Sequence, residues 1–173
     1  QPLEDCATPL VCFIHGTEYI KADAPSVWLE NSGEVAQGYT FGGFGFACVL
    51  PDLLGLGDSP GIHPYLNAAA GARASVDAVR AAREFQVQQG SPLDDQLFLM
   101  GVSAGAHTCL ATNQMMQDVY PDEFSVTAAA GVSGPYVLFP SIKVVMTSDA
   151  PYAGGANLVY LLMGFRSAYP DLF

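Results

Sequence analysis

Positive charge is scarce in this sequence. Lys and Arg together number 6 against 17 Asp and Glu, which gives a formal net charge of −11 at pH 7. Proteins neutralise nucleic-acid phosphates and anionic lipid surfaces with Lys and Arg side chains. The composition therefore argues strongly against nucleic-acid binding and against electrostatic docking on anionic membranes.

Long unbroken apolar runs are also absent. The two longest uncharged stretches, 35–51 and 124–142, are interrupted by Gly, Pro, Ser and Thr, at a density that a helix crossing lipid does not carry. Half of the 173 residues are nevertheless apolar, enough for one domain with its own core. We therefore expect a soluble chain without an integral membrane segment, and its oligomeric state is left open.

Metal and cofactor motifs are missing too. The sequence has no CxxC pair, no Cys/His ligand spacing, no H-E-x-x-H, no phosphate-binding G-x-x-x-x-G-K-[ST] and no G-x-G-x-x-G opening a helix after a strand. We therefore expect neither a metal nor a cofactor. Three of the four cysteines lie in apolar runs and are predicted to be small buried hydrophobes, and one disulfide involving the first remains open; the four are Cys6, Cys12, Cys48 and Cys109.

Short apolar runs alternate with helical patterns along the chain. Near-continuous hydrophobicity bounded by turn residues is typical of parallel strands that are covered on both faces. The order strand, helix, strand, helix, strand predicts an α/β protein with a parallel sheet. The predicted strands are 10–14, 46–50, 96–100 and 126–130, the predicted helices are 68–89 and 104–120, and 37–46 is predicted to be a turn or an irregular approach to a strand.

Both predicted helices have an apolar face. The first ends at Gly90, a residue typical of helix C-termini. Its predicted buried side chains are Ala72, Val76, Val79, Ala82 and Phe85, and those of the second helix are Leu110, Met115 and Met116.

The character of the chain changes beyond Gly134. An apolar, Pro-punctuated segment, 136–146, precedes a predicted helix at 156–168. We expect this part to lie over the sheet rather than in it. The predicted division is a core at 1–135 and an additional apolar segment at 136–173.

One motif carries chemistry. Gly101-Val102-Ser103-Ala104-Gly105 fits the pattern G-x-S-x-G, and it lies between a predicted strand and a predicted helix. This context predicts a strained turn that exposes the Ser103 hydroxyl, while glycines on either side let strand and helix pass closely. The alternative is a serine that only caps the helix.

Two other segments bear on this motif. Gly131-Val132-Ser133 repeats its first half, but Gly-Pro follows, so Ser133 is interpreted as a loop residue. The first predicted strand ends in His15-Gly16-Thr17, where a backbone N–H can stabilise an oxyanion, and the candidate is that of Thr17. His15 itself is interpreted as orienting this loop rather than acting as a base.

A longer segment makes the comparison specific. Residues 51–65 follow the second predicted strand and read P-D-x-x-G-L-G-D-S-x-G-x-H-P-Y. Together with His15-Gly16-Thr17 and with the serine motif and its extension to His107, this segment resembles the α/β-hydrolase superfamily, specifically its secreted lipase and esterase branch. The resemblance covers roughly residues 11–136 and implies a secreted or cell-envelope protein.

The resemblance implies hydrolysis of small-molecule carboxylic esters or lipids through an acyl-enzyme. Ser103 would be the nucleophile, and the backbone N–H groups of Ala104 and Thr17 would form the oxyanion hole. Asp58 and His63 would order the loop near the pocket, although satisfied polar loop residues are the simpler interpretation of both. His107, one helical turn past the serine, is interpreted as a packing residue.

The resemblance also implies that apolar side chains beyond Gly134 line an acyl-chain pocket, although core packing is the simpler interpretation for most of them. The candidates are Tyr136, Val137, Leu138, Phe139, Val144, Val145, Met146, Leu158, Leu161, Leu162 and Met163.

The sequence departs from the family pattern in one respect. In this fold an acid and then a histidine follow the nucleophile, but no histidine follows His107. The acids after Ser103 either lie near the end of the next helix or, like Asp149 and Asp171, fall in the apolar segment, and none can be assigned. We expect that the chain stops inside a cap and that alone it has little or no turnover.

Two other functions stay open at this point. A peptidase or acyltransferase can share the same motif and oxyanion loop, because the pocket decides the acceptor. A non-catalytic hydrolase-like domain that binds an apolar ligand or partner is favoured if the chain truly lacks the histidine.

Overall fold

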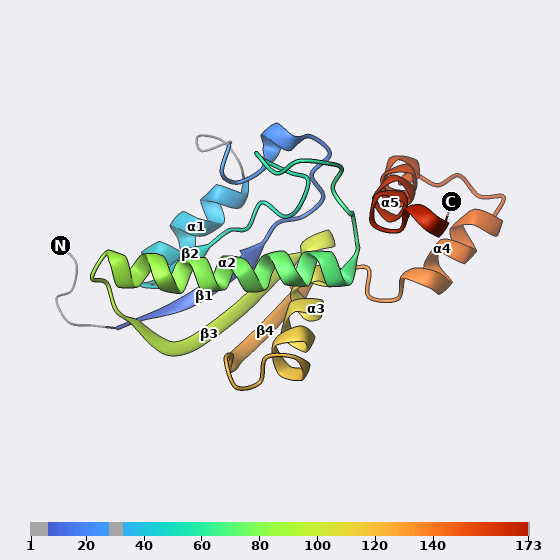
Figure 1. Cartoon of the computed structure of the whole chain (residues 1–173). Coiled ribbons are helices and arrows are strands. Elements are labelled where there is room, and N and C mark those ends of the chain that lie inside the picture. Colours follow the sequence, from blue (N-terminus) through green and yellow to red (C-terminus); the bar gives the residue numbers. More distant parts are fainter. Residues whose placement is uncertain (1–6, 28–32, 173) are drawn as a thin grey trace.

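The chain folds around four parallel strands in the order β2-β1-β3-β4, with helices on both faces (Figure 1). The computed structural model describes residues 7–27 and 33–172. All four predicted strands are present, as are the two predicted helices that connect them. In chain order the elements are β1 (Thr8–Ile14), α1 (Gly33–Gly43), β2 (Ala47–Val49), α2 (Ala68–Gln88), β3 (Leu93–Val102), α3 (Ala104–Asp118), β4 (Val126–Val132), α4 (Leu138–Thr147) and α5 (Gly155–Ala168), with short 3-10 helices at Lys21–Asp23 and Pro170–Leu172.

The main core lies between the sheet and helices α2 and α3. Strand β1 is central, and its last five residues are buried, as expected for a strand covered on both faces. Strand β4 differs, because Thr127, Ala128 and Ala130 are exposed in the described part of the chain. The core joins alternate residues of the two middle strands to one face of each helix: Leu10, Cys12, Ile14, Leu97 and Leu99 from the sheet, Val76 and Val79 from α2, and Cys109 and Met116 from α3.

Helix α1 corrects the prediction of an irregular segment at 37–46. Glycine disfavours a helix by about 1 kcal/mol per residue, and α1 contains four glycines. Aromatic packing on the sheet outweighs this cost, because the Phe41 ring lies 6.2 Å from the rings of both Phe13 and Phe46. A side chain at Gly38 would lie 3.2 Å from Leu50 Cδ1, so this glycine lets the helix approach the end of β2.

Two predicted core residues are exposed. Phe85 of α2 is 57% exposed, because it lies beside β2, an edge strand of only three residues that does not cover its ring. Leu110 of α3 is 41% exposed, since that helix packs through a stripe that includes Cys109 and Met116 and leaves Leu110 beside it. Ala72, Val76 and Val79 are buried as predicted.

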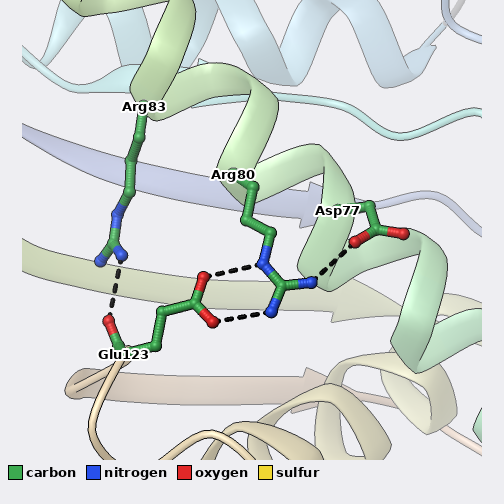
Figure 2. A network of polar contacts seen from close by, with 4 residues as sticks. All are labelled: Asp77, Arg80, Arg83 and Glu123. Atoms are coloured by element: carbon green, nitrogen blue, oxygen red, sulfur yellow. Dashed lines mark hydrogen bonds and ion pairs between the residues drawn. The ribbon is translucent and has the colours of Figure 1, made fainter.

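A polar network ties α2 to the connection between α3 and β4 (Figure 2). The Arg80 guanidinium donates two hydrogen bonds of 2.7 Å to the Glu123 carboxylate and one of 2.9 Å to Asp77. Arg83 donates to the Glu123 carbonyl at 3.2 Å, and Arg80 also lies over the Tyr120 ring. Two of the six basic residues of the chain therefore hold the scaffold together here.

Helices α4 and α5 lie beyond the carboxyl ends of the strands rather than on a face of the sheet (Figure 1). Core packing was the simpler interpretation for their apolar side chains, and it is wrong for most of them. Leu161 is buried, and Leu138, Val145 and Leu158 are partly buried, whereas Tyr136, Val137, Phe139, Val144, Met146, Leu162 and Met163 are exposed. Among the described residues, no helix has both the length and the apolar character that crossing a membrane requires.

Candidate active site

Ser103 occupies a strained turn between β3 and α3. Its backbone angles are φ 55° and ψ −120°, a region that residues with a Cβ rarely adopt. The backbone N–H of Ser103 donates a 2.8 Å hydrogen bond to the carbonyl of Val132 at the end of β4. The neighbouring strand thus fixes the turn, and the side chain of Ser103 remains exposed at the carboxyl edge of the sheet.

The two glycines of the motif have separate steric roles. A Cβ at Gly101 would overlap the backbone of Gly105, where strand and helix pass each other. A Cβ at Gly105 would overlap the carbonyl groups of Ile14 and His15 at the end of β1. Backbone atoms cannot rotate away as a side chain can, so any larger residue at Gly105 would push α3 off the sheet.

The loop after β1 lies directly beside Ser103. A Cβ at Gly16 would lie 3.8 Å from the Cβ of Ser103. His15 is buried, and its ring nitrogens lie 2.9 Å from the Gly16 carbonyl and 3.1 Å from the Asp52 carbonyl. Both partners are backbone carbonyl oxygens, which can only accept a hydrogen bond. The His15 ring therefore lies between its own loop and the segment after β2.

Tyrosine side chains hold the same loop from the other side. The hydroxyls of Tyr65 and Thr17 are 2.7 Å apart. The Tyr65 ring stacks on that of Tyr160 in α5, with centroids 4.7 Å apart and planes at 24°. Tyr160 in turn donates a 2.8 Å hydrogen bond to the carbonyl of Glu18. Sequence reasoning missed this cluster, although Tyr65 ends the motif at 51–65.

The segment after β2 places its polar residues in different environments. Asp58 is exposed, whereas His63 is buried and its Nδ1 lies 2.7 Å from the Leu54 carbonyl. Burial lowers the pKa of His63. The Asp52 carboxylate, which sequence reasoning did not single out, accepts hydrogen bonds from the backbone N–H and the hydroxyl of Ser26. Asp52 therefore anchors this segment to the loop after β1.

A cavity of about 320 Å³ joins the serine motif to α4 and α5. It brings together Ser103, Ala104 and Thr17, three of the predicted site residues, whereas His15, Gly16, Asp58 and His63 do not line it. The predicted lining residues Leu138, Val145, Leu158 and Leu161 do contribute apolar surface. The remaining wall consists of Tyr65, Leu66, Ser133, Gly134, Pro135, Ser141, Ile142, Tyr152 and Asn157.

None of the three histidines lines this cavity. His107 lies on α3, and its Nδ1 is buried without a hydrogen-bond partner among the described residues. Burial lowers the pKa of His107. No acidic side chain contributes to the cavity wall in the described part of the chain. Among the residues that the structure describes, Ser103 is thus exposed to a cavity whose wall holds no histidine and no carboxylate.

The cysteines and acidic groups that the structure describes are scattered rather than clustered. No cluster of three or more His, Cys, Asp or Glu that could hold an ion occurs within 7–27 and 33–172. Cys12, Cys48 and Cys109 are free thiols, and Cys6 lies outside the described residues. Burial raises the pKa of both Cys48 and Cys109 to about 11, so these thiols stay protonated at neutral pH.

Comparison with known proteins supports a hydrolase at a coarse level. No protein-family model matches the chain, and no curated protein does. Among solved structures, the chain is similar to a provisionally assigned hydrolase from Legionella pneumophila, with a TM-score of 0.85 and 29% identity over 96% of this chain and 44% of that one. It is also similar to the rice cell wall degrading esterase LipA from Xanthomonas oryzae, with a TM-score of 0.78 and 29% identity over 98% of this chain and 46% of that one.

A more distant likeness shows the same fold. Candida antarctica lipase A matches with a TM-score of 0.68 and 20% identity, over 99% of this chain and 40% of the lipase. The chain therefore spans less than half the length of each of these structures.

Proposed function

We propose that this chain, whose fold is that of the α/β-hydrolase superfamily, belongs to a serine hydrolase of carboxylic esters with apolar acyl groups. The observation that carries the proposal is the position of Ser103, on a strained turn that opens into a cavity with apolar side chains from α4 and α5 in its wall. Ala104 and Thr17 line the same cavity. Similarity to a provisionally assigned hydrolase and to the esterase LipA supports the assignment.

The reaction follows from these positions. Ser103 Oγ attacks the ester carbonyl carbon, its proton passes to a base, and the carbonyl π electrons move to oxygen. The backbone N–H of Ala104, in the first turn of α3, and that of Thr17 donate to this oxyanion. Collapse expels the alcohol, which takes the proton from the base, and leaves an acyl-Ser103 ester. Water then attacks the carbonyl carbon of acyl-Ser103 while the base takes a proton from the water. Collapse releases the acid and expels Ser103 Oγ, which takes that proton back from the base.

The base and its acid are proposed to come from residues outside the chain, because no histidine or carboxylate of the described part lines the cavity. Without an adjacent imidazole the Ser103 hydroxyl has no acceptor for its proton. Residues 1–173 alone should therefore hydrolyse esters very slowly. The proposed location, outside the cell or in its envelope, rests on the family resemblance.

The test measures hydrolysis of p-nitrophenyl butyrate by the full-length protein, by residues 1–173 alone and by two variants. Ser103→Ala should abolish turnover by the full-length protein, whereas Ser167→Ala, an exposed serine on α5, should keep it. Full activity in Ser103→Ala would refute the proposal. An inactive wild-type protein that still binds fatty acids would favour the non-catalytic alternative.

A further inference from the structure

Ser133, directly after β4, has a backbone conformation that favours glycine. Its φ is 55°, the same as that of Ser103, and a residue with a Cβ keeps a positive φ only where the surrounding structure holds it. Glycine occurs nearby at Gly131 and Gly134, yet the strained position itself carries a hydroxyl. Four described residues other than glycine have a positive φ, and three of them line the cavity: Leu66, Ser103 and Ser133.

The two strained serines are neighbours across the sheet. Val102 of β3 is the register partner of Val132 of β4, and one serine directly follows each of them. Neighbouring strands of a sheet lie about 4.8 Å apart, and the hydrogen bond from the Ser103 N–H to the Val132 carbonyl keeps the two segments together beyond the strands. Both serine side chains are exposed, and both residues line the same cavity. Ser133 is therefore the neighbour of Ser103 on the β4 side.

The Ser133 hydroxyl is available to a ligand. It has no hydrogen-bond partner in the part of the chain that the structure describes. By contrast, the Ser141 hydroxyl in the same cavity wall donates a 2.8 Å hydrogen bond to the Val137 carbonyl. The backbone beside Ser133 is packed closely, because a Cβ at Gly134 would lie 2.7 Å from the Cβ of Ala106 in the first turn of α3. A hydroxyl held on such a backbone loses little conformational entropy when it binds a substrate atom.

The position of Ser133 relative to the proposed oxyanion hole decides which substrate atom it meets. Strand β3 lies between β1 and β4, so Ser133 and the loop that carries Thr17 border Ser103 from opposite sides. With the carbonyl oxygen on the β1 side, the remaining substituents of the ester carbon are the acyl carbon and the alkoxy oxygen. Only the alkoxy oxygen can accept a hydrogen bond. A hydroxyl on the β4 side therefore acts on the alcohol half of the ester.

We propose that the Ser133 hydroxyl donates a hydrogen bond to the alkoxy oxygen of the bound ester and stabilises the negative charge that develops there as the alcohol leaves. This inference rests on the proposed ester hydrolysis. In that step the bond between the ester carbon and the alkoxy oxygen breaks, the electron pair moves to this oxygen, and the base transfers a proton to it. Ser133 keeps its own proton and donates to a second lone pair of the same oxygen. Its effect is largest for alcohols whose anions are strongly basic.

The experiment compares two butyrate esters with the full-length protein. Ethyl butyrate releases a strongly basic alkoxide, whereas p-nitrophenyl butyrate releases an anion that its own ring stabilises. The measured constant is kcat/KM, which covers the reaction up to the departure of the alcohol. Ser133→Ala should lower kcat/KM about 10- to 30-fold for ethyl butyrate and less than about threefold for p-nitrophenyl butyrate. Because the acyl group is the same, a change in the acyl pocket would affect both esters alike.

A second variant, Ser133→Gly, separates the hydroxyl from the backbone. Glycine adopts a φ of 55° without strain, so this variant should be at least as stable to urea as Ser133→Ala and should show the same selective loss toward ethyl butyrate. If alanine at this position prevents folding, the glycine variant gives the same comparison. Ser167→Ala, at an exposed serine of α5 that does not line the cavity, is the matched control and should leave kcat/KM for both esters unchanged.

Several results would overturn the inference. Unchanged kcat/KM for ethyl butyrate in both variants would mean that the hydroxyl does not meet the substrate, and an equal fall for the two esters would mean that Ser133 acts through packing alone. A wild-type protein that hydrolyses only the p-nitrophenyl ester would also refute it, because no alkoxide would then leave. Ser103→Ala separates the two proposals: retained hydrolysis refutes the serine mechanism itself, whereas its loss together with normal rates in both Ser133 variants refutes only the role of Ser133.

Discussion

Replacing Ser103 by glycine should stabilise the protein and abolish the proposed ester hydrolysis at the same time. Ser103 has φ 55° and ψ −120°, and a residue with a Cβ in such a region costs about 1–3 kcal/mol. Glycine removes that cost but adds freedom to the unfolded chain, which costs about 0.4–1 kcal/mol. The expected net gain is therefore about 1 kcal/mol in the free energy of unfolding.

Urea denaturation followed by circular dichroism measures this gain. Ser103→Ala should leave stability nearly unchanged, because alanine keeps the Cβ that causes the strain, and it should be as inactive as the glycine variant. Ser167→Gly is the matched control: this serine lies within α5, where glycine should destabilise by about 0.5 kcal/mol. If Ser103→Gly were less stable than Ser103→Ala, the argument that the turn stores strain would be wrong.

Three further predictions concern the scaffold and its titratable groups. Gly105→Ala should destabilise the protein by about 2 kcal/mol or more, since its Cβ would overlap backbone atoms at the end of β1. Gly42→Ala, which lies in open space on α1, should stabilise it by about 0.5–1 kcal/mol. Similar urea midpoints for the two variants would refute the steric argument. Burial lowers the pKa of His63, so the unfolded chain binds a proton first on acidification and stability should fall as the pH drops below about 6.5. His63→Gln should flatten this dependence in urea midpoints measured between pH 7 and 5.5, and an unchanged slope would contradict the assignment. At pH 8, Cys48 and Cys109 should react with iodoacetamide about 100-fold more slowly in the native than in the urea-unfolded protein, and equal rates by peptide mass spectrometry would show that burial does not protect them.

Local patterns were sufficient to predict the scaffold. The strands were predicted because β1 and β3 are short apolar runs bounded by turn residues, and the two main helices because α2 and α3 have a buried stripe at helical spacing. The predicted α/β fold and its likeness to the α/β-hydrolase superfamily are confirmed by the similar solved structures. The serine turn was predictable for the same reason, since its strand, glycines and helix are contiguous.

The errors arose where distant residues decide the local structure. Helix α1 forms despite its glycines because Phe41 packs against Phe13 and Phe46, a contact that no local propensity encodes. Phe85 was expected in the core because its spacing fits the buried face of α2, but the short edge strand β2 does not reach far enough to cover it. Spacing predicts which face a side chain occupies, but it does not predict how much of that face is covered.

The tyrosine contacts of the cavity could not be predicted for the same reason, because they join residues far apart in the sequence. Thr17 and Tyr65 are 48 positions apart, and Tyr160 reaches Glu18 across 142 positions, so no short window contains these hydrogen bonds. The motif at 51–65 contained Tyr65, yet its part in the cavity follows only from the position of α5.

The contacts that hold the serine turn differ from those that hold the opposite wall of the cavity. Ser103 is held by its hydrogen bond to Val132 of β4 and by the close approach of Gly105 to β1, and both are strands of the sheet. On the opposite wall, α5 meets the loop after β1 through the hydrogen bonds from Tyr160 to the Glu18 carbonyl and from Tyr19 to Asn157. Because strain at a turn persists only where the surrounding structure is rigid, Ser103 should keep its geometry in variants that loosen α5, such as Tyr160→Phe. Such variants should therefore lower kcat, because they loosen the loop that carries Thr17, while the urea midpoint of global unfolding stays unchanged. If kcat and the urea midpoint fell together, the serine turn and α5 would unfold as one unit.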